Sequence, residues 1–177
     1  RDSVASRGLG DVYKRQTRIR KAIANGELED VTQMLGRPYS ITEIVVDGRQ
    51  VGSANGIATA NFQPTTALLP QIGVYIVESV IDGMQVRGVA DLGWRPTFAD
   101  ARPEMPVLEV HYLDFEGNLY GKALTISFLK RLRDEITFAT PDALFEQIRK
   151  DITAARLFAP PPIEGNGRLK PAPTMMA

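Results

Sequence analysis

The feature that most constrains the fold of this chain is a series of β-branched and aromatic runs separated by tight turns rather than by helices. Asp82-Gly83 lies between two such runs, and an Asp-Gly pair in that position is a strong signal for a β-hairpin. A second turn, Glu116-Gly117-Asn118, separates two later runs. Strands joined by such short turns pair antiparallel. The runs that we predict as strands are 41–47, 73–81, 85–92, 107–114 and 123–129.

An antiparallel sheet of about six strands in one small domain usually closes on itself or packs as a sandwich, because this removes unpaired strand edges. The chain has 177 residues, a length that suits a single domain. The sequence therefore predicts a mainly β fold, either a barrel or a sandwich.

Helices are predicted only on either side of this strand region. Ile19 and Ile23 share a helical face, and 28–35 repeats apolar residues at helical spacing. Near the other end, Thr140 is a predicted N-cap and Pro141 occupies the first helical position. An apolar stripe at i, i+4 spacing then predicts a helix docked on the sheet; it comprises Leu144, Ile148, Ile152 and Ala155.

The two ends of the chain lack the patterns of folded structure. Residues 1–16 show neither helical nor strand periodicity, so we expect a non-native or disordered leader. Residues 159–177 are rich in Pro and Gly, which is typical of a disordered tail. The expected domain is therefore 17–158.

Composition limits the classes of function. The chain has no cysteine and one histidine, which excludes a disulfide scaffold, thiolate metal sites and a multi-histidine metal centre within one chain. Its 21 basic and 21 acidic residues are distributed so that 17–158 is slightly acidic, which disfavours nucleic-acid binding. No apolar run has the length of a membrane span, and no secretory signal is visible. We therefore expect a cytoplasmic protein with neither nucleic acid nor membrane as partner.

A glycine-spaced segment is the first candidate for chemistry. Gly48, Gly52 and Gly56 recur at intervals of four, and glycines allow backbone N–H groups to approach and cradle phosphates. The alternative is a flexible loop that connects strands. Thr59 and Asn61 follow and project to the same side if the chain is extended there. Their hydroxyl and amide oxygens suit a hard cation such as Mg²⁺, although a polar strand start would look the same.

Glu109 is the second candidate. In the run 107–114, Leu108 and Val110 share one face with Tyr112, whereas Glu109 and His111 lie on the other. A carboxylate among apolar neighbours in mid-strand is a potential general base, and a solvated strand residue is the alternative. His111 is interpreted as structural. The basic run 130–133 is most simply the solvated end of a strand, although it could also face an anionic ligand.

The order of these segments resembles the riboflavin kinase domain of the bacterial bifunctional riboflavin kinase/FAD synthetases. The resemblance extends over essentially all of 17–158. The matching stretches are TRIR at 17–20, LGRPY at 35–39, the spaced glycines leading into TANF at 59–62, GVY at 73–75, LGWRPTF at 92–98, LEVHYLDFEGNLYG at 108–121 and LRDEITF at 132–138.

The resemblance implies a small six-stranded antiparallel Greek-key barrel with a docked C-terminal helix, and the transfer of phosphate from ATP to riboflavin to give FMN and ADP. It implies that Thr59 and Asn61 bind Mg²⁺-ATP and that Glu109 is the catalytic base. It also implies that Arg133 lies in a loop closing over the flavin. The glycines form the phosphate-covering flap in this resemblance, namely Gly48, Gly52 and Gly56.

The chain departs from the family pattern at several positions. Ala58 stands where the family usually has proline, which should loosen the turn before Thr59. Glu43 and Asp91 add negative charge if they face the site. The other departures are Ser53 and Asn55. The adenylyltransferase half expected in the parent protein is represented only by 17–20. The alternative function is therefore a non-catalytic flavin- or nucleotide-binding barrel, a degenerate fragment of a bifunctional FAD synthetase.

Overall fold

The computed structural model describes residues 4–47, 57–95 and 105–163. The glycines at 48, 52 and 56, like Ser53 and Asn55, lie outside these ranges, so the predicted flap is not described. The elements in chain order are α1 (Val4–Ala24), α2 (Leu28–Leu35), β1 (Tyr39–Val46), β2 (Ala60–Phe62), β3 (Gly73–Ile81), β4 (Met84–Arg95), β5 (Met105–Tyr112), β6 (Ala123–Arg133) and α3 (Pro141–Leu157).

The six strands form a closed antiparallel barrel in the order β1-β2-β5-β4-β3-β6, with β6 returning to β1. The predicted hairpin is confirmed: Ile81 pairs with Met84, and Asp82 and Gly83 form the turn between them. Both turn residues have positive φ, 50° and 82°, as a two-residue hairpin turn of this handedness requires. The mainly β fold expected from the turn signals is therefore confirmed. Of the two predicted architectures, the chain forms the barrel and not the sandwich.

The barrel interior is filled by one alternate set of side chains from every strand. Leu108, Val110 and Tyr112 all belong to it, as the period of two predicts. The outward faces of β3 and β6 are also buried in part, because Ile76 and Leu129 pack against α3. The other side chains that fill the barrel interior are mainly Phe62, Tyr75, Val77, Leu92, Ile126 and Phe128, all fully buried.

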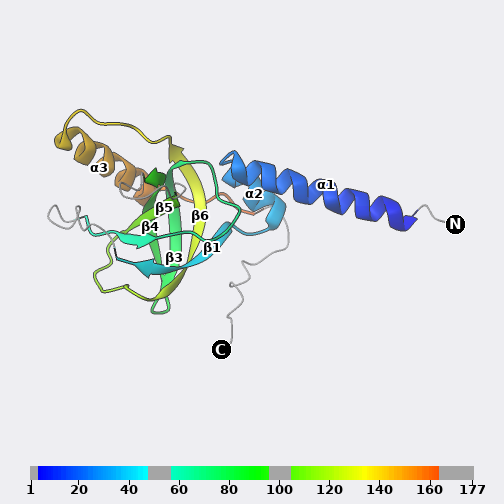
Figure 1. The fold of residues 1–177 in the computed structure, drawn as a ribbon, viewed down its shortest axis with the longest axis horizontal. Coiled ribbons are helices and arrows are strands. Elements are labelled where there is room, and N and C mark those ends of the chain that lie inside the picture. Colours follow the sequence, from blue (N-terminus) through cyan, green and yellow to red (C-terminus); the bar gives the residue numbers. More distant parts are fainter. Residues whose placement is uncertain (1–3, 48–56, 96–104, 164–177) are drawn as a thin grey trace.

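The C-terminal helix begins and docks largely as predicted. The Thr140 side chain accepts a hydrogen bond from the Ala143 N–H, and Pro141 is the first helical residue. Ile152 and Ala155 pack on the outside of the barrel, but Leu144 is exposed, so the predicted stripe docks only over its second half. In Figure 1, α3 lies on one side of the barrel, and α1 and α2 lie on the other.

The first helix is longer than the sequence predicts. It begins at Val4, so the expectation that residues 1–16 lack regular structure is wrong for 4–16. Gly8 and Gly10 disfavour a helix, and residues 12–18 are all exposed, so no apolar stripe marks this part of it. In Figure 1 the N-terminal part of α1 projects away from the barrel. That the segment is a non-native leader stays a prediction, and the predicted tail falls mostly outside the described residues.

None of the helices in the described part of the chain combines the length and apolar character needed to cross a membrane.

Glu43 has a structural partner. Its side chain lies on the inward face of β1 with Ile41 and Val45, and the residue is 8% exposed. One carboxylate oxygen accepts a hydrogen bond from the Thr65 N–H at 2.9 Å, and the Thr65 hydroxyl lies within 3.4 Å of both oxygens. Glu43 therefore links the segment after β2 to the inner face of β1.

We expect Glu43→Ala to lower the free energy of unfolding by about 1–3 kcal/mol, because it leaves a backbone N–H without its acceptor. Glu43→Gln keeps an acceptor oxygen and should lose less. Urea unfolding of both variants measures the difference. An alanine variant as stable as the native chain would contradict this role.

Candidate functional site

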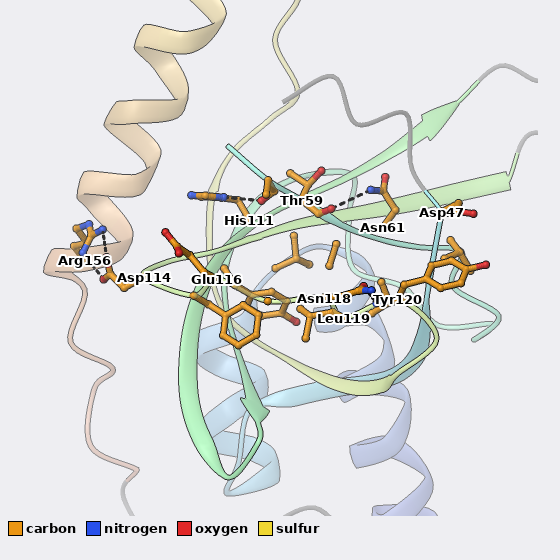
Figure 2. Close-up of a pocket in the computed structure, with 18 residues that line it drawn as sticks. Asp47, Thr59, Asn61, His111, Asp114, Glu116, Asn118, Leu119, Tyr120 and Arg156 are labelled. Atoms are coloured by element: carbon orange, nitrogen blue, oxygen red, sulfur yellow. Dashed lines mark hydrogen bonds and ion pairs between the residues drawn. The ribbon is translucent and has the colours of Figure 1, made fainter. Parts of the chain in front are cut away.

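A cavity in the described part of the chain lies where β2 begins and β5 ends, and its volume is about 1140 Å³. The segment 114–120, between β5 and β6, forms one wall, and 58–61 forms the opposite one (Figure 2). The end of β1, the end of β5 and Arg156 of α3 complete the lining. Segments far apart in the sequence therefore contribute to one hollow on the barrel surface.

Thr59 and Asn61 both line this cavity, as does Ala60 between them, and the shared orientation of the two polar side chains stays a prediction. Asn61 is buried within β2 and Thr59 is half-buried in the segment before it. The Asn61 amide nitrogen donates to the Thr59 carbonyl at 3.3 Å, which fixes the orientation of the side chain (Figure 2).

The ionised groups around the cavity are mainly acidic. Asp47, Asp114 and Glu116 line it, and Arg156 is the one lysine or arginine among the described lining residues. Arg156 is paired with Asp114 through two hydrogen bonds of 2.6 and 2.8 Å, which hold the pKa of the Asp114 carboxyl below its usual value. A polyphosphate therefore needs a cation with it to enter this cavity favourably.

The donor set fits a divalent cation that is shared with a phosphate. The described residues contain no cluster of three His, Cys, Asp or Glu side chains able to hold a metal by themselves. Thr59 and Asn61 supply neutral oxygen donors of the kind hard cations prefer. Two neutral ligands hold such an ion weakly, so phosphate oxygens would have to complete its coordination.

The strand register brings Glu109 beside Asn61. Asn61 of β2 pairs with Glu109 of β5, which in turn pairs with Asp91 of β4. The neighbouring row, with Val110 at its centre, is in the barrel core, so the row of Glu109 lies on the outer face. Glu109 is half-buried there and lies next to a cavity-lining side chain.

Two of the departures from the family pattern have different positions. Asp91 lies on the same outer face as Glu109 and directly beside it, so a second carboxyl is close to the predicted base. Glu43 faces the barrel interior and is not among the described side chains that line the cavity, so the condition under which it would add charge to the site is not met.

Arg133 is not in a loop. It is the last residue of β6, and its guanidinium pairs with Asp151 of α3 through N–O distances of 2.7, 3.0 and 3.2 Å. The basic run 130–133 is a strand end as predicted, but the prediction that it is solvated is wrong, because these residues are half-buried. Arg133 therefore fastens α3 to the barrel, and contact with a flavin stays a prediction.

The end of β4 also differs from the expectation. Residues 93–95 continue the strand beyond its predicted end at 92, and Trp94 is exposed. The carboxylate of Glu135 lies so close to Gly93 that a Cβ at this position would displace it. The segment after β6 consequently lies directly against the strand that carries Asp91.

Sequence reasoning missed the roles of three residues in and around the site. Asp151 is a buried carboxylate on α3, and the signal for it was a charged residue placed beside the apolar stripe. Tyr112 is buried against the Ser79 hydroxyl at 2.7 Å, and burial raises its pKa to about 12, so it lines the cavity as a neutral phenol. His111 hydrogen-bonds to the Ala58 carbonyl, a long-range contact that no local pattern predicts.

Comparison with known proteins agrees with the geometry. The family model described as riboflavin kinase, or flavokinase, matches residues 35–159, which is more than half of the chain. The chain belongs to the riboflavin kinase family. The match begins at the end of α2 and includes the whole barrel and α3, so it covers every predicted site residue.

Curated relatives support the same family. The bifunctional riboflavin kinase/FMN adenylyltransferase of Pseudomonas fluorescens is 41% identical over 146 residues, which is 82% of this chain and 46% of that protein. The protein of the same name from Bacillus subtilis is 40% identical over 134 residues, 75% of this chain and 42% of that one. The chain thus spans less than half the length of these relatives.

One solved structure shares the fold. The crystal structure of a macrolide-efflux protein from Streptococcus pneumoniae superposes with a TM-score of 0.74 at 32% identity, over 81% of this chain and 46% of that one. It supports the barrel architecture.

Proposed function

We propose that this domain transfers the γ-phosphate of ATP to the 5′-hydroxyl of riboflavin, giving FMN and ADP. Family membership supports the reaction class. The observation that carries the assignment to particular residues is the pairing of Asn61 with Glu109 on the outer face of the barrel. In this pairing the residue predicted to bind the metal-nucleotide complex and the predicted base are neighbours at the edge of the cavity.

In this proposal, Thr59 and Asn61 hold the metal-nucleotide complex through their side-chain oxygens, and the metal is Mg²⁺. The bound cation supplies neutralisation of the phosphate charge. Glu109 accepts the proton of the riboflavin hydroxyl. The hydroxyl oxygen then forms its bond to the γ-phosphorus, and the bond between that phosphorus and the leaving oxygen of ADP breaks. Positioning and charge neutralisation do most of the work in such transfers.

Location and scope follow the same reasoning. We propose that the enzyme is cytoplasmic, and the absence of cysteine agrees with this location. The adenylyltransferase activity in the names of the relatives belongs to those proteins, and we assign only the kinase activity to the domain 17–158.

The test is to incubate the purified chain with riboflavin, ATP and Mg²⁺ and to separate the flavins by chromatography. FMN well above a control without protein supports the kinase. Flavin or nucleotide binding without FMN would favour a barrel that binds its ligands but has lost turnover. If the chain shows neither ligand binding nor FMN formation, the proposed function is overturned.

We expect Asn61→Ala to weaken Mg²⁺-ADP binding by about 10–100-fold, the loss that corresponds to one hydrogen bond or ligand contact to a charged group. Metal-free ADP should bind both proteins about equally, because the contact is made through the cation. Calorimetric titrations with and without Mg²⁺ measure the two affinities.

Asn25→Ala, at an exposed position in the turn between α1 and α2, is a control expected to bind like the native chain. Equal weakening of Mg²⁺-ADP and metal-free ADP in Asn61→Ala would argue against a metal-directed role for Asn61.

A further inference from the structure

The segment that carries Thr59 lies just outside the β-ladder. The paired positions of β2 begin at Ala60, which faces Val110 of β5, and residues 57–59 precede them. Thr59 therefore depends on contacts other than the strand pairing described for β2 to keep one orientation. Because its hydroxyl is a proposed ligand of the metal-nucleotide complex, its position matters for binding.

His111 supplies one such contact. It follows Val110 on β5, and its Nδ1 lies 2.8 Å from the Ala58 carbonyl oxygen (Figure 2). A carbonyl oxygen only accepts hydrogen bonds, so Nδ1 must carry the proton. The contact joins two residues that are 53 positions apart and fixes the peptide group between Ala58 and Thr59.

The peptide group on the other side of Thr59 is also held by a side chain. The Asn61 amide donates to the Thr59 carbonyl at 3.3 Å. Thr59 is thus flanked by two backbone carbonyls, and a different side chain binds each of them. His111 and Thr59 line the same cavity, whereas the His111 hydrogen bond is made to the backbone.

We propose that His111 is a positioning residue that holds Thr59 in place for the metal-nucleotide complex. The inference rests on the proposed function, because Thr59 matters only if that complex binds here. His111 acts through the Ala58 carbonyl and not on the substrate. Its effect should therefore depend on the Thr59 hydroxyl and on a hydrogen-bond donor at the place of Nδ1.

The first test uses substitutions that separate the donor position from the ring. In His111→Asn the side-chain amide nitrogen occupies roughly the place of Nδ1, whereas in His111→Gln it lies farther out. We expect His111→Ala and His111→Gln to weaken Mg²⁺-ADP binding by about 3–10-fold, the loss of one hydrogen bond. His111→Asn should stay within about 2-fold of the native chain, and metal-free ADP should bind all four proteins alike.

A double-mutant cycle with Thr59→Val separates positioning from direct contact. If His111 acts through Thr59, His111→Ala should cost little further affinity once the hydroxyl is gone. A full additional loss in the Thr59→Val background, or a His111→Asn variant as weak as His111→Ala, would overturn the proposal. Thermal midpoints of all variants identify any that fail to fold, and His111→Asn then carries the comparison.

A spectroscopic measurement tests the geometry without any ligand. The chain has one histidine, so ¹⁵N-edited NMR of the tag-free protein above neutral pH reports on His111 alone. We expect the proton on Nδ1, and a proton on Nε2 would overturn the proposal. If the native chain shows the Nδ1–H form but binds no Mg²⁺-ADP, the proposed function fails and the role toward Thr59 fails with it. If it binds Mg²⁺-ADP and the variants do not differ, only the role of His111 fails.

Discussion

Glu109→Gln is expected to lower the turnover of riboflavin phosphorylation by about 10²–10⁴-fold, the usual contribution of a positioned general base. Glutamine keeps the shape of the side chain and one acceptor oxygen, but it does not take up the hydroxyl proton at neutral pH. Glu109 is half-buried beside Asn61 and Asp91, so the substitution changes the chemistry of this position more than its packing.

Initial rates of FMN formation at saturating riboflavin and Mg²⁺-ATP measure this effect. Riboflavin and Mg²⁺-ADP affinities, taken on the same preparation, should change by no more than a few-fold, because the base acts in the transition state. Glu27→Gln, at an exposed position in the turn between α1 and α2, is the matched control and should keep its full rate. Near-native turnover in Glu109→Gln would remove Glu109 from the mechanism, and FMN formation by the native chain would still support the kinase.

Asp151→Ala is expected to lower the free energy of unfolding by about 3 kcal/mol, because removing one partner of a buried ion pair leaves the other charge uncompensated. The Asp151 side chain is 7% exposed and accepts hydrogen bonds from Arg133 and Gln147. Asp151 also lies one turn before Ala155, which is fully buried against the barrel. The loss should therefore loosen the docking of α3 as well as the ion pair.

Chemical unfolding monitored by Trp fluorescence or circular dichroism gives the stability of this variant. Glu146→Ala on the same helix is the matched control: Glu146 pairs with Lys150 at 2.7 Å, but both side chains are well exposed. Its removal should change stability little, because water already solvates both charges. Equal effects of the two substitutions would mean that the Arg133–Asp151 pair contributes no more than a surface ion pair.

Local patterns predicted the strands that are joined by recognisable turns. The hairpin of β3 and β4 was predictable because Asp82 and Gly83 accept the backbone conformation that the turn needs. The strand β2 has only three residues, Ala60–Phe62, too few for a periodic signal by themselves. The N-terminal part of α1 was missed because its glycines and exposed side chains hide the helix from any reading of apolar periodicity.

The candidate site was predictable one residue at a time but not as an arrangement. Alternation along a strand placed Thr59 with Asn61 and put Glu109 on the face opposite Val110. The pairing of Asn61 with Glu109 depends on β2 lying next to β5, two strands that are not consecutive in the chain. The bonds from His111 to Ala58 and from Arg133 to Asp151 likewise join separate elements, so they follow from the closed barrel and not from any local pattern.

The shortness of β2 also affects how the barrel holds together. Among the described residues, β2 pairs with β1 at two positions and with β5 at three, whereas β3 pairs with β4 at nine. The ring of strands is therefore closed most weakly where Asn61 lies, and amide hydrogens there should exchange with solvent through the lowest-energy local opening of the barrel. A nucleotide bound to Thr59 and Asn61 would bind this weakest part directly. Occupancy of the site would then oppose that opening before it affected the global stability of the fold.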